Sequence, residues 1–242
     1  MNKISKLSKL CSSLTIGKNN MIGDNVKIME NVIIGNNNKI YDNTIIYPNT
    51  TIGNNNVILN NNIIGEHSIE AKYDFTDKVF NGLQIGNNNF LHISNKIFNG
   101  FHKNTVIGNN NKILGEVHLG HDVKIKNNVH IYPRALLSGF VEMNDYSGAG
   151  VSCVIHQRKK IGNYAFLGMN NTITKDVFPF YININNKYHK FNYNRIDIIN
   201  FNDNEIVINE IRDKYINNDI NINNYKLALD KNIFDIIKNF IS

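Results

Sequence analysis

Aliphatic residues recur along this chain with a period of six. The series consists of Ile16, Ile22, Ile28, Ile34, Ile40, Ile46, Ile52, Ile58, Ile64, Ile85, Leu91, Ile97, Ile107, Ile113, Leu119, Ile125, Ile131, Leu137, Met143, Ala149, Ile155, Ile161, Leu167 and Ile173. A period of six fits neither the turn of an α-helix nor the two-residue alternation of an ordinary strand. Hexapeptide repeats are instead a signature of parallel β-helices, so the repeat predicts a solenoid.

The residues around each aliphatic position have the properties that the corners of such a solenoid need. Glycine often follows the aliphatic residue, as at Gly17, Gly35 and Gly53, and asparagine fills many of the other positions. Both residue types tolerate the left-handed backbone conformation that a tight corner requires. Three hexads then form one triangular coil of about 18 residues, with one aliphatic side chain per strand pointing inward. We therefore predict a core of stacked isoleucine and leucine side chains.

The hexads are interrupted twice and stop near residue 177. The interruptions, "GEHSIEAKYDFTDKVFNGLQ" and "NGFHKN", predict loop excursions at about residues 66–84 and 98–106, which in solenoids commonly border the binding face. We expect about three coils over residues 16–69, one over 85–102 and four over 107–178. Segments 204–216 and 225–242 have helical patterns. The predicted domains are a parallel β-helix over residues 1–178 and a small α-helical region over residues 179–242.

The composition limits what this solenoid can bind. A net charge of +6 and a pI of about 9.1 favour an acidic partner, such as a phosphate-bearing ligand or a carrier protein. The lysines are scattered and no nucleic-acid recognition motif accompanies them, so we expect no nucleic acid. The two cysteines, Cys11 and Cys153, form no CxxC motif and favour a reducing compartment. No signal-peptide pattern or membrane-length apolar stretch is present, so the sequence predicts a cytoplasmic protein.

The stretch "GEVHLGHDV" at residues 115–123 concentrates titratable side chains. His118, His121 and Asp122 fall within five positions, and the chain has only 8 histidines. Leu119 belongs to the inward series, so the side chain of His121 is expected to face outward. An imidazole can remove a proton at neutral pH, and a neighbouring carboxylate can orient it. The isolated histidines, expected to be surface residues, are His67, His92, His102, His130 and His189.

Stacking of the coils brings further residues near His121. Phe140 and His156 follow it by 19 and 35 positions. With about 18 residues to a coil, the two lie almost above His121 on successive coils. We expect these residues to form one wall of a groove.

A hexapeptide β-helix followed by helices resembles the left-handed β-helix acyltransferases. Three segments resemble those of the UDP-N-acetylglucosamine acyltransferases, which begin lipid A synthesis. The stretch "IGEHSIEAKY" at residues 64–73 is similar to that family's IGExxQDLKY, "VHLGHDV" at 117–123 to its HIAHDC, and "VIHQRKKIG" at 154–162 to its VHQFxxIG. The last two segments are separated as in the family. The resemblance covers roughly residues 14–200 and implies a left-handed coil.

The resemblance also implies an activity and a set of site residues. The family moves an acyl group from an acyl-carrier-protein thioester to a nucleotide sugar, without a bound cofactor or metal; coenzyme A is the other donor to consider here. Its active sites lie between the subunits of a homotrimer. His121 falls on the catalytic base, Asp122 on its acidic partner and the N–H of Gly139 on the oxyanion donor. The residues that match substrate-binding positions are Glu70, Lys72, Tyr73, His118, His156, Gln157, Met169, Asn194 and Arg195.

Three positions depart from the family pattern. Phe140 stands where the family has a histidine, which removes a hydrogen-bond donor and predicts a more apolar wall. A basic Lys-Arg-Arg cluster of the family is replaced by "NYNRIDIINF" at residues 192–201, in which Asn194 is matched and Arg195 substitutes in part. Met169 occupies the position that limits acyl-chain length, and its bulk predicts a short to medium chain, down to acetyl.

Three other functions stay open from the sequence. The first is an acetyl-coenzyme A dependent N-acetyltransferase acting on a nucleotide-linked amino sugar for surface glycans. The second is metal-dependent hydration, as in the γ-class carbonic anhydrases, but His118 and His121 are only three positions apart and no third histidine completes that pattern. The third is a structural or binding solenoid, which predicts unbroken coils, whereas this repeat has two loops.

Overall fold

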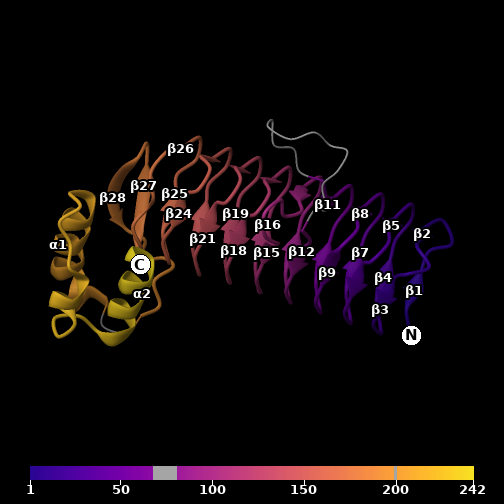
Figure 1. Ribbon diagram of the computed structural model, residues 1–242, viewed down its shortest axis with the longest axis horizontal. Helices are drawn as coiled ribbons and strands as arrows, with labels where there is room; N and C mark the ends of the chain where they lie inside the picture. The colour runs from indigo at the N-terminus through magenta and orange to yellow at the C-terminus, as the bar shows by residue number, and fades with distance from the viewer. Residues whose placement is uncertain (68–80, 199–200) are drawn as a thin grey trace.

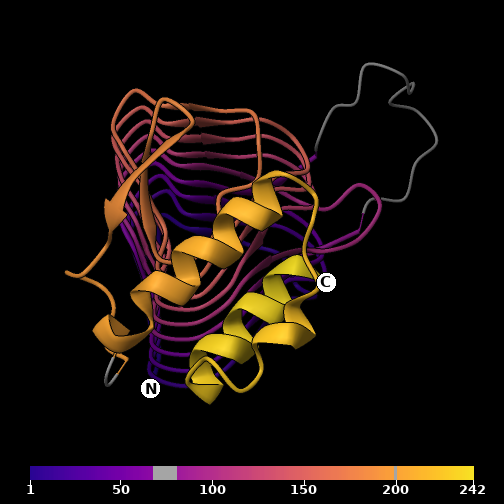
Figure 2. The same ribbon diagram turned by 90° about the vertical axis from the view of Figure 1, so that its left-hand side faces the viewer.

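The parallel β-helix predicted from the hexads is confirmed, together with the C-terminal helices. The computed structural model describes residues 1–67, 81–198 and 201–242. Figures 1 and 2 show the coils stacked along one axis, with the N-terminus at one end and the helices at the other. The strands form three sheets, each running along one face of the prism. Within the described residues no helix is long and apolar enough to cross a membrane.

Sheet A contains one strand from each of nine coils and ends in a two-stranded extension. Its strands are β1 (Lys3–Ile4), β4 (Met21–Ile22), β7 (Lys39–Ile40), β10 (Val57–Ile58), β13 (Phe90–Leu91), β16 (Lys112–Ile113), β19 (His130–Ile131), β22 (Gly148–Ala149), β25 (Phe166–Leu167), β27 (Tyr181–Ile184) and β28 (Lys187–Phe191).

Sheets B and C form the other two faces, and their strands also pair in parallel between successive coils. The strands of sheet B are β2 (Lys9–Leu10), β5 (Lys27–Ile28), β8 (Ile45–Ile46), β11 (Ile63–Glu66), β14 (Lys96–Phe98), β17 (His118–Leu119), β20 (Leu136–Leu137), β23 (Val154–Ile155) and β26 (Thr172–Ile173). The strands of sheet C are β3 (Thr15–Ile16), β6 (Ile33–Ile34), β9 (Thr50–Ile52), β12 (Leu83–Ile85), β15 (Thr105–Ile107), β18 (Lys124–Ile125), β21 (Glu142–Met143) and β24 (Lys160–Ile161).

The strands begin near the start of the predicted β-helix domain, before the first aliphatic residue of the predicted series, Ile16. Strands β1 and β2 precede it, because Ile4 and Leu10 continue the spacing of six toward the N-terminus. Ile4 remains 41% exposed, since its coil has a neighbour on one side only. Charged and small residues surround these two positions and hide the hexad in the sequence.

The predicted aliphatic ladder forms the core. Ile58, Leu91, Ile113 and Ile131 are fully buried and pair strand by strand along sheet A. Each such side chain contributes about 1.5–3 kcal/mol on burial. Asparagines at the corners have positive φ, for instance Asn37 at 57°. The asparagine-rich composition is therefore structural, because this residue pays little for a left-handed backbone.

A second ladder, of buried asparagine side chains, runs inside one corner. It consists of Asn20, Asn38, Asn56, Asn89 and Asn111. The Nδ2 of Asn56 donates to Oδ1 of Asn38 at 3.0 Å and to the carbonyl of Gly86 at 2.9 Å. Its Oδ1 accepts from the N–H of Asn89 at 2.9 Å. Each asparagine thus links three coils.

Replacing Asn56 with alanine is expected to lower the free energy of unfolding by about 2–4 kcal/mol, because it leaves buried partners on both neighbouring coils without a hydrogen bond. Denaturant unfolding measures the change. The control is Asn60→Ala, since the Asn60 side chain makes no hydrogen bond to any residue that the structure describes. Equal stability of the two variants would show that the ladder does not hold the coils together.

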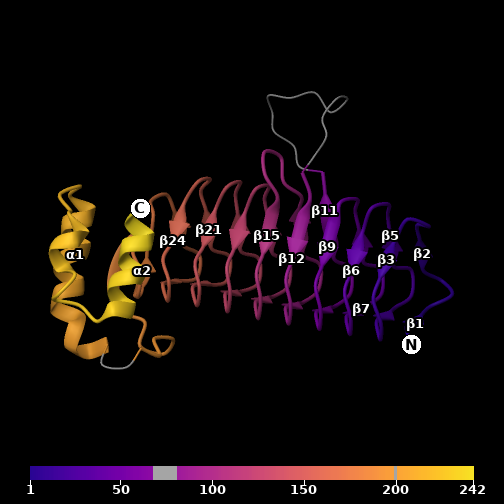
Figure 3. The same cartoon turned by 60° about the horizontal axis from the view of Figure 1, so that its bottom comes forward.

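The region after residue 178 begins with strands and not with a helix. Strand β27 pairs in parallel with β25, and β28 folds back antiparallel against β27. The helical elements then follow as η1 (Phe201–Asn204), α1 (Glu205–Ile216), η2 (Ile222–Tyr225) and α2 (Lys231–Ile241). Along β27 the buried residues Tyr181 and Asn183 alternate with the more exposed Ile182 and Ile184, as in a strand with one covered face. Figure 3 shows the helices at the C-terminal end of the coils, where Ile208, Ile211 and Ile237 share a second core with Phe178.

Both interruptions of the repeat occur between a strand of sheet B and the next strand of sheet C. The first separates β11 from β12, and the second separates β14 from β15. The two interruptions therefore occur at the same corner of the prism on neighbouring coils, and Figures 2 and 3 show the stacked coils that share this corner. We call this edge the B–C corner. On the following coils it carries residues 121–122, 139–140 and 157–158.

Candidate active site

Two columns of residues lie at the B–C corner, on the three coils that follow the second interruption. The first column consists of His121, Gly139 and Gln157, one on each coil, and the second of Asp122, Phe140 and Arg158. The N–H of Phe140 donates to the carbonyl of His121 at 3.0 Å, and the N–H of Arg158 donates to that of Gly139 at 3.0 Å. The wall predicted from the spacing is present, but the residue directly above His121 is Gly139, and Phe140 lies in the adjacent column.

The carboxylate of Asp122 joins the His121 ring to the second loop. Nδ1 of His121 lies 2.7 Å from Oδ2 of Asp122, whose side chain is fully buried. The backbone N–H groups of Phe101, His102 and Lys103 donate to the same carboxylate at 3.2, 2.9 and 2.6 Å. Asp122 has a φ of 59°, the left-handed conformation found at the same position of the other corners.

These contacts also decide the charge of Asp122. Burial by itself raises the pKa of its carboxyl group, but the hydrogen bonds from the His121 side chain and from the N–H groups of Lys103, His102 and Phe101 outweigh burial. The pKa of Asp122 therefore lies below the ordinary value of 3.8. The carboxylate is ionised at neutral pH and can stabilise a protonated imidazole beside it.

Gly139 lies directly against the His121 ring. A β-carbon at position 139 would come within 2.6 Å of both Cε1 and Nε2 of the imidazole, so only glycine fits there. The N–H of Gly139 makes no hydrogen bond within the described part of the chain. An N–H group in this place suits the predicted role of stabilising an oxyanion next to the base.

The Gly139→Ala variant is expected to reduce kcat by about 10- to 100-fold, since the new methyl group displaces a ring that Asp122 holds in place. Steady-state kinetics with a parallel thermal unfolding curve tests this. Gly115→Ala is the matched control: it occupies the first position of a different corner, and its β-carbon would meet only ordinary or slightly tight contacts of 3.3 Å and above. A Gly139→Ala protein as active as this control would contradict the assignment.

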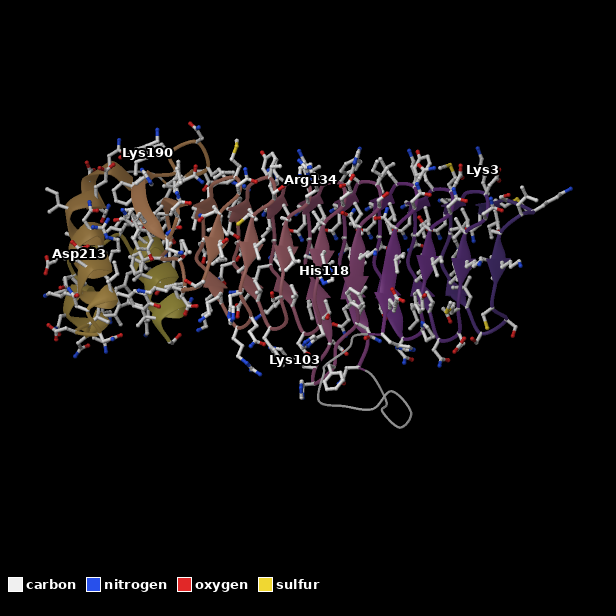
Figure 4. The ribbon with its side chains drawn as sticks, turned by 90° about the horizontal axis from the view of Figure 1, so that it is seen from above. Lys3, Lys103, His118, Arg134, Lys190 and Asp213 are labelled. Atoms are coloured by element: carbon white, nitrogen blue, oxygen red, sulfur yellow. The ribbon has the colours of Figure 1, made fainter. Side chains whose placement is uncertain are left out.

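The other predicted site residues on this side of the molecule have distinct environments. His118 lies on sheet B, half-buried, with its ring 5.0 Å from that of Phe98. Burial, and then the charge of Lys96, lower its pKa, so this imidazole is neutral at pH 7. His156 and Gln157 are exposed next to the B–C corner. Figure 4 shows His118 on the face between Lys103 at one edge and Arg134 at the other.

The prediction that Phe140 makes the wall more apolar needs a correction. The Cζ atom of Arg158 lies 4.1 Å from the centroid of the Phe140 ring, and Nζ of Lys103 lies 6.0 Å from it. The His102 and His121 rings lie 5.5 and 5.3 Å from the same ring. Phe140 is therefore surrounded by cationic and titratable groups, and His102 is not an isolated surface residue.

The sequence analysis missed Phe101, His102, Lys103 and Arg158. Arg158 could have been found by following the spacing of about 18 residues from Asp122 through Phe140. The three loop residues carried no such signal, because an excursion has no repeat to place it.

The predicted C-terminal site residues lie on another face. Arg195 donates from Nη2 to the carbonyl of Asn128 at 2.8 Å and packs over Gly148 of sheet A. Together with Asn194 and His130 it lines a hollow of about 600 Å³. Burial, followed by the charges of Arg195 and Lys112, lowers the pKa of His130 to about 4. Within one chain the B–C corner and this hollow are separate.

Met169 does not join the His121 corner either. Met169 is 70% exposed at the corner between sheets A and B. Glu70, Lys72 and Tyr73 lie outside the described residues. Among the residues that the structure describes, no group of three or more His, Cys, Asp or Glu side chains is arranged to hold a metal ion.

Comparison with known proteins relates this arrangement to hexapeptide transferases. The family model described as bacterial transferase hexapeptide (six repeats) matches residues 13–46 and 104–139. An acyl-[acyl-carrier-protein]–UDP-N-acetylglucosamine O-acyltransferase from Nautilia profundicola is 40% identical over 103 residues, which are 41% of this chain and 40% of that protein. Its counterpart from Aliivibrio salmonicida is 31% identical over 136 residues, 54% of this chain and 50% of that protein. The chain thus spans no more than half the length of these curated relatives.

The likeness in structure extends further than the likeness in sequence. The solved UDP-N-acetylglucosamine acyltransferase from Bacteroides fragilis superimposes with a TM-score of 0.84 at 25% identity, over 98% of this chain and 96% of that one. The enzyme of the same description from Francisella novicida gives a TM-score of 0.76 at 26% identity, over 98% and 85%. The chain therefore resembles these proteins from the first coils to the C-terminal helices.

Proposed function

We propose that this chain, whose fold is that of the UDP-N-acetylglucosamine acyltransferases, is itself an acyltransferase that moves an acyl group from a thioester to a hydroxyl of UDP-N-acetylglucosamine or a closely related nucleotide sugar. The observation that carries the proposal is the His121 ring, bonded to Asp122 at 2.7 Å and lying directly against Gly139. A base, a carboxylate that orients it and a backbone donor are the groups that acyl transfer to a hydroxyl requires.

We propose a role for each of these groups. With Nδ1 of His121 bonded to Asp122, Nε2 takes the proton from the sugar hydroxyl as its oxygen attacks the thioester carbon. The tetrahedral intermediate places its negative charge on the former carbonyl oxygen, next to the N–H of Gly139. When the C–S bond breaks, the imidazolium returns its proton to the leaving thiolate. Asp122 stabilises the imidazolium between these two steps.

The donor and the chain length form part of the proposal. The thioester is carried by an acyl carrier protein or by coenzyme A, and the acyl group is short to medium in length, including 3-hydroxyacyl. The bulk of Met169, at a position where the resemblance implies a limit on chain length, supports a short chain. A cytoplasmic location, which the two unpaired cysteines favour, belongs to the same proposal.

A homotrimer completes the proposal. His121 lies at the B–C corner, whereas Asn194 and Arg195 line the hollow on sheet A. If all three residues serve one nucleotide sugar, a second copy of the chain must bring its sheet A face to the His121 corner. The separation of the two groups within one chain therefore supports active sites between subunits. Sedimentation or light scattering measures the mass of the assembly.

The direct test is an assay of the purified protein with UDP-N-acetylglucosamine and thioesters of increasing acyl length, on both carrier protein and coenzyme A. We expect a product heavier than the acceptor by one acyl group, together with release of a free thiol. An amino-sugar nucleotide with acetyl-coenzyme A is the second acceptor. Transfer only to the amine would favour an N-acetyltransferase, to which the missing basic cluster and Met169 also point. Transfer to neither acceptor would refute acyl transfer.

A further inference from the structure

A guanidinium group is held beside the proposed catalytic base by an aromatic ring. The Cζ atom of Arg158 lies 4.1 Å from the centroid of the Phe140 ring, within the range of a cation–π contact. Phe140 and Arg158 occupy the left-handed corner position of two adjacent coils, with φ values of 62° and 61°. The Arg158 side chain remains exposed.

A lysine and two imidazole rings also lie around Phe140. Nζ of Lys103, from the loop bonded to Asp122, lies 6.0 Å from the centroid of Phe140. The His102 ring is 5.5 Å from it and the His121 ring is 5.3 Å from it. Within residues 1–67, 81–198 and 201–242, neither Arg158 nor Lys103 forms an ion pair. The neighbouring carboxylate of Asp122 is already bonded to His121 and to three loop N–H groups.

We propose that Arg158, held on Phe140, and Lys103 form a binding site for the phosphate groups attached to the acceptor sugar. The proposal rests on the proposed function, because it takes His121 as the place where the acceptor hydroxyl reacts. A planar guanidinium matches two phosphate oxygens at once, and a lysine adds a point charge. The guanidinium of Arg158 is held by the ring beside it, and the bond from the Lys103 N–H to Asp122 fixes the backbone from which the lysine extends.

The position of the site favours the acceptor over the donor. In a nucleotide sugar the phosphate is attached to the same ring as the reacting hydroxyl, so it lies near any base that contacts that hydroxyl. In coenzyme A or a carrier protein, a long pantetheine arm separates the phosphate from the thioester. Arg158 and His121 both contact the ring of Phe140, which suits the short separation.

The test measures ligand binding separately from turnover. Calorimetry gives the Kd for UDP-N-acetylglucosamine and for coenzyme A in the wild type, in Arg158→Gln and in Arg134→Gln. Arg134 is the matched control because it is also an exposed corner residue with a φ of 61°, on the opposite edge of sheet B (Figure 4). We expect Arg158→Gln to weaken binding of the nucleotide sugar by at least about 10-fold, with coenzyme A unchanged and Arg134→Gln without effect.

The effect should weaken as salt increases, since ions screen an exposed phosphate contact. Equal losses in the two arginine variants, a loss confined to coenzyme A, or a wild type that does not bind the nucleotide sugar would each overturn the site.

Turnover measured on the same samples separates the two proposals. If the wild type turns over normally and Arg158→Gln binds the nucleotide sugar as well as the wild type does, the phosphate site is refuted and the proposed acyltransferase function stands. If Arg158→Gln alone loses binding and the wild type shows no turnover, the phosphate site stands and the acyltransferase function is refuted.

Discussion

Replacing His121 with alanine is expected to lower kcat by at least about 100-fold, with little change in the Kd for the nucleotide sugar. The physical reason is that the proposed base is removed, and Gly139 and Gln157, the other members of its column, carry no group that can take the proton of the acceptor hydroxyl. The measurement is the initial rate at saturating thioester, with the binding constant obtained separately by calorimetry.

The control for this variant is His189→Ala. His189 is an exposed histidine on β28, in the hairpin that extends sheet A. The His189→Ala substitution also replaces one histidine with alanine, but it leaves the B–C corner unchanged. A His121→Ala protein with the wild-type rate would exclude this imidazole as the base, whatever the acceptor.

Asp122→Asn is expected to have the second largest effect, a loss of about 10²- to 10⁴-fold in kcat. Asparagine keeps the size of the side chain but not its charge. The amide can no longer stabilise the imidazolium, and one of its two ends becomes a donor where the carboxylate accepts from His121, Phe101, His102 and Lys103. The variant should therefore also loosen the loop that carries Lys103.

Two measurements separate these consequences. The pH dependence of kcat reports the base, because loss of the carboxylate should move the limb of the profile that belongs to the imidazole. Amide hydrogen exchange at Phe101 to Lys103 reports the loop. Because the pKa of Asp122 is lowered in the folded state, its stabilising contribution is complete above the ordinary aspartate value of 3.8 and is lost as the pH falls through its folded pKa. The loop contact should thus persist throughout the neutral range.

Asp145→Asn is the matched control. The Oδ1 atom of Asp145 accepts from the N–H and from Nδ2 of Asn127 at 2.8 and 3.0 Å, at a corner of the prism away from His121. Asparagine already occupies the equivalent place on the preceding coils, at Asn109 and Asn127, so this change should be tolerated. If both aspartate variants behave alike, Asp122 has no special part in positioning the base.

The fold was predictable to a large extent because every level of the sequence points the same way. The aliphatic residue at each sixth position, the asparagine at each corner and the end of the hexads all carry local information. The predicted series omitted the first coil because Ile4 and Leu10 stand among charged and small residues. The hairpin of β27 and β28 was missed because it follows the last hexad and has no repeat of its own.

The pairing of His121 with Asp122 could be expected from the sequence, since the two residues are adjacent. The sequence also determined the coil, and with it which positions face inward. The residues that contact the base from other coils and loops are distant from it in the sequence. Contacts from coil to coil join residues about one coil apart, and each loop adds residues to that interval, so the N–H of Lys103 reaches Asp122 across 19 positions and that of Phe101 across 21.

Only the tertiary structure therefore decided that the loop residues Phe101 and Lys103 lie beside Asp122 and His121. It likewise placed Asn194 and Arg195 on another face. The physical reason is that a hexad specifies the direction of each side chain within its own coil. What lies beside that side chain is decided by the stacking of coils and by loops that obey no repeat.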